Sequence, residues 1–180
     1  MIYLALLKGI NVGGKHLIKM DVLKKMFENM GYKNIRTLLQ SGNVIFETPK
    51  GKNDAIKKKI ESHLEKSLGY SVAVVIRTID EIEKIIAAYP FSKIKDHDNP
   101  DKCRIFVSFL DGEPDKSGVK EFISLSNKNE IYHIEGINVY LLCRIHFLDS
   151  IIAKNIFEKK LKVKATTRNW ATVNKLLIFK

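Results

Sequence analysis

The apolar and polar residues of the first eighty positions follow two periods in turn, and each period predicts a different kind of element. Short apolar runs are typical of buried strands, whereas apolar residues that recur every third or fourth position predict amphipathic helices. The pattern predicts, in chain order, a strand over 2–8, a helix over 20–30, strands over 35–39 and 44–46, a helix over 52–68 and a strand over 71–78. This βαββαβ order indicates a ferredoxin-like plait.

The second half of the chain repeats this plan less regularly. It predicts a helix over 80–89, a strand over 104–110, a helix over 113–125, a hairpin over 130–142, a helix over about 147–161 and a last helix after Thr167. We therefore predict the α+β fold class, with two ferredoxin-like α/β plaits of antiparallel sheets and helices, the second modified and extended by C-terminal helices. The expected domains are residues 1–80 and residues 81–180.

The charge balance points toward nucleic acid, but the choice of basic residues does not. A formal net charge of +11 is the electrostatic footprint of a nucleic-acid binder. However, Lys outnumbers Arg by 26 to five, whereas sites that grip phosphate with two parallel hydrogen bonds favour Arg. The densest run, 57–59, lies in a predicted amphipathic helix, which is typical of a solvated face. Both faces of the first strand are apolar, so we expect cover from the second domain or a partner chain, not the bare aromatic face of an RNA-recognition plait.

Several other classes of protein find no support in the sequence. The apolar run at 2–7 is too short to span a membrane and lacks the flanks of a leader, so we expect a cytoplasmic protein without membrane contact. Cys103 and Cys143 lack the spacing of a disulfide framework or a zinc site. The acidic stretch 96–101 lacks the Gly and the distal Glu of a calcium loop. We expect neither a metal nor a cofactor, and the sequence indicates no oligomeric state.

The stretch KGINVGGKH, residues 8–16, has the spacing of a phosphate-binding loop, with Gly9, four residues, then Gly14 and Lys15. In that motif a hydroxyl holds magnesium, and here His16 takes its place. The predicted helix also begins later than the motif requires, and an antiparallel hairpin follows in place of a parallel sheet. Hydrolysis of nucleoside triphosphates is therefore not predicted.

The C-terminal stretch ATTRNWATVNKLLIF, residues 165–179, combines an apolar stripe with cations. With Thr167 as the N-cap, a helix would place Trp170 on its apolar side and Arg168 and Lys175 on another. Either this helix simply docks through its tryptophan, or the two cations contribute to a site near the first loop.

Four stretches of the chain, in order, resemble the bacterial domain-of-unknown-function family 1697. They are LALLKGINVGGK, TLLQSGNVIF, YPFS and TTRNWATVNKL, and the similarity extends over essentially the whole chain. The resemblance implies two ferredoxin-like domains and no established activity. Two departures stand out: Lys8 replaces the family's usual Arg, and HFLDSII replaces a Gly-x-Gly-Arg-Ser-Lys-Leu pattern that looks suited to receive an anion, with only Ser150 retained.

Three interpretations of these motifs remain. The first is a binding protein that holds a small phosphorylated or otherwise anionic ligand, or a nucleic-acid segment, in a cleft between its domains. The second is an enzyme of unknown reaction in which Lys15, His16 or Asn11 acts. The third is a structural role, in which polar side chains satisfy buried backbone groups. The candidate ligand-binding residues are Lys8, Gly9, Asn11, Gly13, Gly14, Lys15, Gln40, Ser41, Asn43, Arg168, Asn169 and Lys175.

Overall fold

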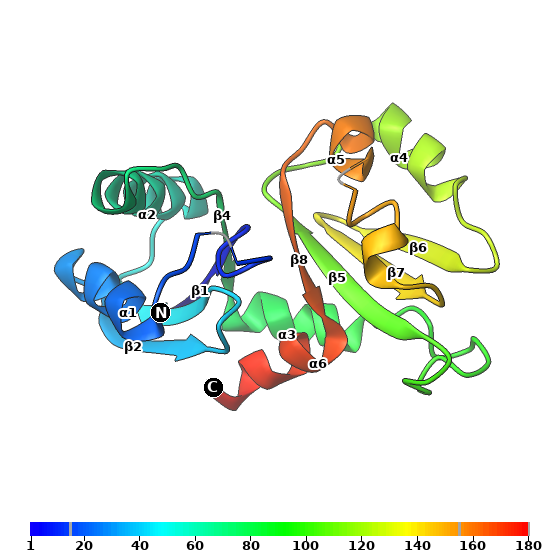
Figure 1. Cartoon of the computed structure of the whole chain (residues 1–180), viewed down its shortest axis with the longest axis horizontal. Coiled ribbons are helices and arrows are strands. Elements are labelled where there is room, and N and C mark those ends of the chain that lie inside the picture. The colour runs from blue at the N-terminus through cyan, green and yellow to red at the C-terminus, as the bar shows by residue number, and fades with distance from the viewer. Residues whose placement is uncertain (15, 155, 180) are drawn as a thin grey trace. The chain divides into compact units, whose positions relative to one another are not determined.

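The computed structural model describes residues 1–14, 16–154 and 156–179 (Figure 1). The chain forms two compact units, one of residues 1–83 with the chain from Leu176 on, and one of residues 84–175. Each contains one four-stranded antiparallel sheet with helices, which confirms the predicted α+β class.

The first unit is a complete βαββαβ plait. Its elements are β1 (Ile2–Leu7), α1 (Met20–Asn29), β2 (Lys33–Leu38), β3 (Asn43–Glu47), α2 (Asn53–Leu68) and β4 (Val74–Thr78). The sheet order is β2-β3-β1-β4, so β1 and β3 are central, and all neighbouring strands are antiparallel. Helices α1 and α2 lie together on one face of this sheet (Figure 1).

The aromatic residues of the first sheet belong to its core. Tyr3 and Phe46 stack with ring centroids 6.0 Å apart, but both are buried beneath the helices in a cluster that includes Phe27. The hydroxyl of Tyr3 donates to the carbonyl of Gly51 and accepts from its N–H, at 3.2 and 3.1 Å. These rings are therefore not a platform for nucleic-acid bases.

The second unit repeats the βαββαβ order. The chain passes between the units in α3 (Ile79–Ala87) and continues with β5 (Arg104–Leu110), α4 (Lys116–Ile123), β6 (Glu130–Glu135), β7 (Asn138–Cys143), the 3-10 turn η1 (Phe147–Asp149), α5 (Ile156–Leu161), β8 (Ala165–Asn169), α6 (Trp170–Lys175) and η2 (Leu176–Phe179). The sheet order is β6-β7-β5-β8.

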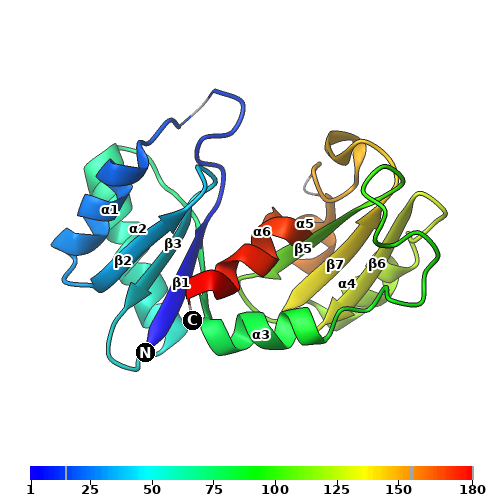
Figure 2. The same ribbon diagram turned by 90° about the horizontal axis from the view of Figure 1, so that it is seen from below.

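Helices cover the second sheet from both sides. Phe122 of α4 and Phe157 of α5 share a core with Phe106 and Leu110 of β5 on one face. Helix α6 contacts β5 from the opposite face (Figure 2). There the Tyr140 hydroxyl donates to the carbonyl of Ile85 in α3, at 2.8 Å.

The prediction of a helix that starts after Thr167 was wrong at its first turn. Residues 165–169 form β8, which pairs antiparallel with β5, and the hydroxyls of Thr167 and Ser108 face each other at 2.7 Å. The N-cap of α6 is Asn169, whose Oδ1 accepts from the N–H of Thr172 at 2.8 Å. Arg168 is therefore a strand residue, and the second plait has its full set of four strands.

The prediction of a continuous helix over about 147–161 was also wrong. The 3-10 turn η1 ends at Ser150, whose extended backbone (ψ 153°) cannot continue a helix. The hydroxyl of Ser150 then accepts from the N–H of Ala153, and α5 begins at Ile156. Among the described residues, none of the helices has the length and apolarity that a bilayer crossing demands.

Candidate functional site

The glycine-rich loop of the first unit, residues 8–19, joins β1 to α1 and is fastened to its neighbours by backbone hydrogen bonds. The N–H of Leu7 donates to the carbonyl of Gly42 at 2.8 Å, and the N–H of Lys8 donates to that of Ala73 at 2.9 Å. Gly9, Gly13 and Gly14 all have positive φ, with open space around each α-carbon. Glycine thus permits the turns of this loop without steric cost.

Asn11 holds the loop to the hairpin turn between β2 and β3. Its Nδ2 donates to the carbonyls of Ile18 and Gln40, at 3.0 and 2.8 Å, and its Oδ1 accepts from the N–H of Ile18 at 2.8 Å. The backbone of Asn11 adopts φ 53°, a region that Asn tolerates better than most residues. The amide therefore has a structural role and is not turned toward a ligand.

The hairpin turn itself is packed against the same loop. Gly42 has φ 71°, and a Cβ at this position would lie 2.7 Å from Cδ1 of Ile10. Asn43 is fully buried, and its Nδ2 donates to the Leu38 carbonyl and to Oγ of Ser41, both at 2.9 Å. The geometry around Asn11, Asn43 and Gly42 thus favours the structural interpretation of this part of the motif.

Lys8 and His16 of this loop and Gln40 of the hairpin turn are at least partly exposed. Lys8 is half-buried, and Gln40 is exposed, with its backbone carbonyl as the group that binds Asn11. Lys15 lies outside the described residues. His16 is exposed and packs on Tyr70 with ring centroids 4.2 Å apart. His16 therefore lacks the enclosed position that an acid–base role would favour.

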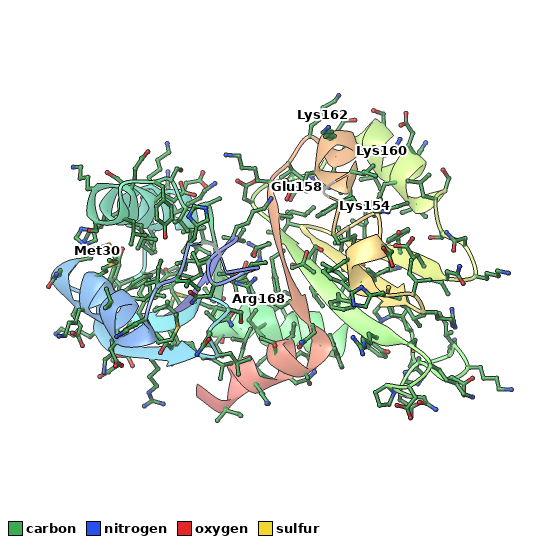
Figure 3. All side chains as sticks on the ribbon, viewed as in Figure 1. Met30, Lys154, Glu158, Lys160, Lys162 and Arg168 are labelled. Atoms are coloured by element: carbon green, nitrogen blue, oxygen red, sulfur yellow. The ribbon has the colours of Figure 1, made fainter. Side chains whose placement is uncertain are left out.

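Arg168, from the second set of predicted residues, is a buried cation on β8. Its Nη1 donates to Oγ1 of Thr166 at 2.7 Å and to the carbonyl of Thr167 at 2.9 Å. Figure 3 labels Arg168 among the side chains of the whole chain. Burial lowers its pKa to about 10, so the guanidinium stays charged at neutral pH. Lys175 is exposed at the end of α6, and Asn169 is exposed at its start. The Lys8 to Asn43 set lies in the first unit, whereas Arg168, Asn169 and Lys175 lie in the second.

A cavity of about 460 Å³ opens in the second unit, and of the predicted residues only Asn169 lines it. This volume falls in the range of small-molecule sites. The rings of Tyr89 and Trp170 lie 4.8 Å apart at an interplanar angle of 34°, and the Tyr89 hydroxyl lies 3.1 Å from Nδ1 of His97. We call this site the aromatic cavity; its lining residues are Tyr89, His97, Asp98, Pro100, Cys103, Arg104, Ile105, Asn169, Trp170 and Ala171.

A second cavity of about 370 Å³ adjoins the first and carries basic residues. The two share Pro100, Cys103 and Arg104. We call the second site the basic cavity; it is lined by Pro100, Asp101, Lys102, Cys103, Arg104, Cys143, Arg144, Ile145 and His146. Its basic side chains outnumber its single acid, so its electrostatic character suits an anion.

Arg104 stands at the boundary of the two cavities. Its side chain is exposed, and no described residue forms a hydrogen bond or an ion pair with its guanidinium. The neighbouring cations are partly engaged: Lys102 bonds to Asp96 at 3.1 Å, and Nη1 of Arg144 donates to the carbonyl of Lys128 at 3.0 Å. Arg104 is thus the cation of this region with the most free donors.

The two cysteines near these cavities are not activated nucleophiles. Burial raises the pKa of the Cys103 and Cys143 thiols. The Cys103 thiol donates to the carbonyl of Asp96 at 3.0 Å, and that of Cys143 donates to Ile145 at 3.3 Å. Both remain protonated at neutral pH, where a thiolate would be needed for attack.

The turn that departs from the family pattern already holds a carboxylate of the chain. Oε1 of the buried Glu130 accepts from the N–H of Ile151 at 3.1 Å and from the Tyr132 hydroxyl at 2.7 Å. Burial, with this hydrogen bond in support, raises the pKa of Tyr132, so the phenol remains a donor. An external anion at Ile151 would have to compete with Glu130.

Sequence reasoning missed both cavities, although one signal was present. Two of the five arginines of the chain, Arg104 and Arg144, line the basic cavity, while lysines dominate elsewhere. The Tyr89 that begins the stretch YPFS and the Trp170 of the C-terminal stretch meet in the aromatic cavity. These two parts of the resemblance thus converge in the structure.

The fold defines a class of α+β proteins with two successive ferredoxin-like plaits. The chain belongs to a family of proteins of unknown function, DUF1697, whose model matches residues 1–140. This match confirms the family resemblance, and it ends before the departing turn and the C-terminal stretch. The structure of the conserved bacterial protein SP0830 from Streptococcus pneumoniae is similar in fold, with a TM-score of 0.72. The two sequences are 20% identical, and the match covers 98% of this chain and 97% of the SP0830 chain. No curated protein matches the chain.

Proposed function

We propose that this protein binds a small organic anion in the aromatic cavity of its second unit. The observation that carries the proposal is that Arg104, whose guanidinium bonds to no described residue, lines the same cavity as the paired rings of Tyr89 and Trp170. The proposal keeps the ligand class that the sequence suggests and assigns it to a cavity built from residues 89–171. A cytoplasmic location remains part of this proposal.

The two kinds of lining group explain why one ligand would carry both a ring and a charge. Aromatic walls favour flat apolar groups, which gain stacking contacts and lose contact with water. An exposed Arg offers two parallel donors to a carboxylate or a phosphate. A ligand with only one of these features would leave half of the site unused.

The enzyme interpretation gains less from the geometry. His16 is exposed on the loop of the first unit, and the thiols of Cys103 and Cys143 are protonated at neutral pH. The histidine of the aromatic cavity, His97, has its Nδ1 beside a tyrosine hydroxyl and not beside a carboxylate that would orient it. Binding is therefore the better supported function.

The test is a thermal-shift screen of the full chain against inorganic phosphate, phosphosugars, aromatic carboxylates, phenyl phosphate and nucleotides. A ligand at a hundred times its Kd should stabilise the fold by about 2.7 kcal/mol, which is readily seen. Arg104→Gln should reduce the shift, whereas the matched control Lys116→Gln, at an exposed lysine of the same unit, should leave it unchanged. If no compound shifts the wild type, or if both variants respond alike, the proposal is wrong.

A further inference from the structure

We infer that the anion is a nucleoside phosphate, with its base in the aromatic cavity and its phosphate in the basic cavity. This inference rests on the proposed function and narrows it to one ligand class. The two cavities share the lining residues Pro100, Cys103 and Arg104, so a molecule of two parts can occupy both. A nucleotide is such a molecule, because its ribose separates a flat ring from a charged group.

The aromatic cavity suits a heterocycle better than a plain hydrocarbon ring. Its polar groups include the exposed carboxylate of Asp98 and the amide of Asn169. The Oδ1 of Asn169 caps α6, and its Nδ2 makes no hydrogen bond to a described residue. An acceptor and a donor are therefore available to the edge of a base or to ribose hydroxyls, which a phenyl group could not use.

Stacking supplies the affinity for the base. Trp170 is half-buried and tilted against Tyr89, and both rings line the cavity. Base-on-aromatic stacking tolerates any base, because every base has a π-face. The site should therefore discriminate between bases through Asp98 and Asn169 and not through the rings.

The basic cavity suits a phosphate group. The cavity is lined by one acidic residue, Asp101, and by four basic residues, Arg104, Arg144, Lys102 and His146. Arg104 can bind two phosphate oxygens at once through its planar fork, while the lysine adds a point charge. A nucleoside without a phosphate would leave this cavity filled only by water.

The chain offers a direct probe, because Trp170 is its only tryptophan. We would titrate the full chain with adenosine and cytidine monophosphates, the matching nucleosides, phenyl phosphate, a phosphosugar, inorganic phosphate and a single-stranded oligonucleotide, and follow tryptophan fluorescence and the heat of binding. We expect both nucleotides to quench the fluorescence and to bind at least about tenfold more tightly than the nucleosides and phenyl phosphate. Inorganic phosphate should leave the fluorescence unchanged.

Three variants separate the two halves of the site. Trp170→Leu should weaken nucleotide binding by about tenfold, whereas Trp170→Phe keeps a stacking ring and should retain most of it. Arg104→Gln should abolish the preference for nucleotide over nucleoside. Circular dichroism checks that each variant is folded, and the titrations of wild-type protein decide the matter even if a variant is not.

The outcomes distinguish the inference from the function that it rests on. If phenyl phosphate or a phosphosugar binds as tightly as the nucleotides, the nucleotide inference is overturned and the anion site stands. If none of these compounds binds, the nucleotide inference is overturned, and the proposed function falls with it only if the aromatic carboxylates of the thermal-shift screen also fail to bind. If only single-stranded oligonucleotides bind, and Trp170→Leu binds them with equal affinity, both are also overturned. The basic cavity would then be better explained as part of a nucleic-acid-binding surface.

Discussion

Gly118 of α4 lies directly against the backbone of Lys160 in α5. A Cβ built on Gly118 would overlap the carbonyl oxygen of Lys160 and would stand 2.9 Å from its carbonyl carbon. Backbone atoms cannot move aside as a flexible side-chain end can. The absence of a side chain at Gly118 is therefore what allows α4 and α5 to pack at this distance.

We expect Gly118→Ala to destabilise the protein by about 2 kcal/mol, because the two helices must separate. This sign is opposite to the gain of about 1 kcal/mol that Gly→Ala gives inside an unconstrained helix. Urea denaturation measures the change. The control is Gly112→Ala in the same unit, where the nearest atom is Cγ2 of Val163 at an ordinary 3.9 Å. Equal stabilities of the two variants would contradict the prediction.

Asn11 should be the most sensitive polar residue of the glycine-rich loop. Asn11→Ala removes three hydrogen bonds and places alanine at φ 53°, so we expect a loss of about 2–3 kcal/mol in the free energy of unfolding. Asn11→Gly loses the same bonds without the backbone strain and should cost less.

Gln40→Ala is the control for the Asn11 variants. The Gln40 side chain is exposed, and only its backbone carbonyl accepts from Asn11. We expect a change within about 0.5 kcal/mol, measured by the same chemical denaturation. A large loss of stability in Gln40→Ala, or none in Asn11→Ala, would show that the Asn11 side chain does not hold the loop to the hairpin turn.

Lys59, in the lysine run at 57–59, has a structural role. Nζ of Lys59 donates to the carbonyl of Met30 at the end of α1, at 2.8 Å, and lies 5.0 Å from the centroid of the Tyr32 ring. A charge-assisted hydrogen bond and a cation–π contact should together contribute about 1 kcal/mol. Lys59→Met should therefore lower the unfolding midpoint, while Lys58→Met, at the exposed neighbour, should not. Identical midpoints would mean that the contact with Met30 and Tyr32 contributes nothing.

The first plait could be predicted from the sequence because its apolar residues carry a clear period. Strand β8 could not, since residues 165–169 hold only one apolar side chain, Ala165. Its buried positions are Ala165, Thr166 and Arg168, and the last two are joined by a hydrogen bond of 2.7 Å. Polar pairing of this kind leaves no hydrophobic alternation, and Thr167, a residue type typical of helix N-caps, favoured a helix.

The candidate site could be predicted only in part, and the physical reason differs from that for β8. Motif spacing located the loop around Asn11, but spacing cannot tell whether an amide faces a ligand or its own backbone. The aromatic cavity depends on the pairing of β5 with β8, which sets Phe106 opposite Asn169 and brings Arg104 near Trp170. That contact joins residues more than sixty positions apart, and no local pattern indicates it.

Asp115 should make stability depend on pH in the acid range. The Ser117 hydroxyl, the Gly118 N–H at 3.0 Å and Nζ of Lys162 at 3.1 Å all donate to its carboxylate, and they hold its pKa well below the usual range, with the Ser117 bond as the largest cause. Because the folded pKa is lower than that of the unfolded chain, about 3.9, the carboxylate stabilises the fold above that pH. The contribution is lost as the pH falls through the lowered pKa.

The measurement compares the thermal midpoints of the wild type and Asp115→Asn as the pH falls from about 7 to about 2. Asn keeps an acceptor at the start of α4 but carries no charge, so the gap between the two proteins should be constant above about pH 5 and should narrow below about pH 4. Asp101→Asn is the control, because it removes an exposed carboxylate that bonds to no described residue. The difference in thermal midpoint between wild type and this variant should not narrow in the same way. A gap between wild type and Asp115→Asn that stays constant to the lowest pH would mean that Ser117 and Lys162 do not bind the ionised carboxylate in solution.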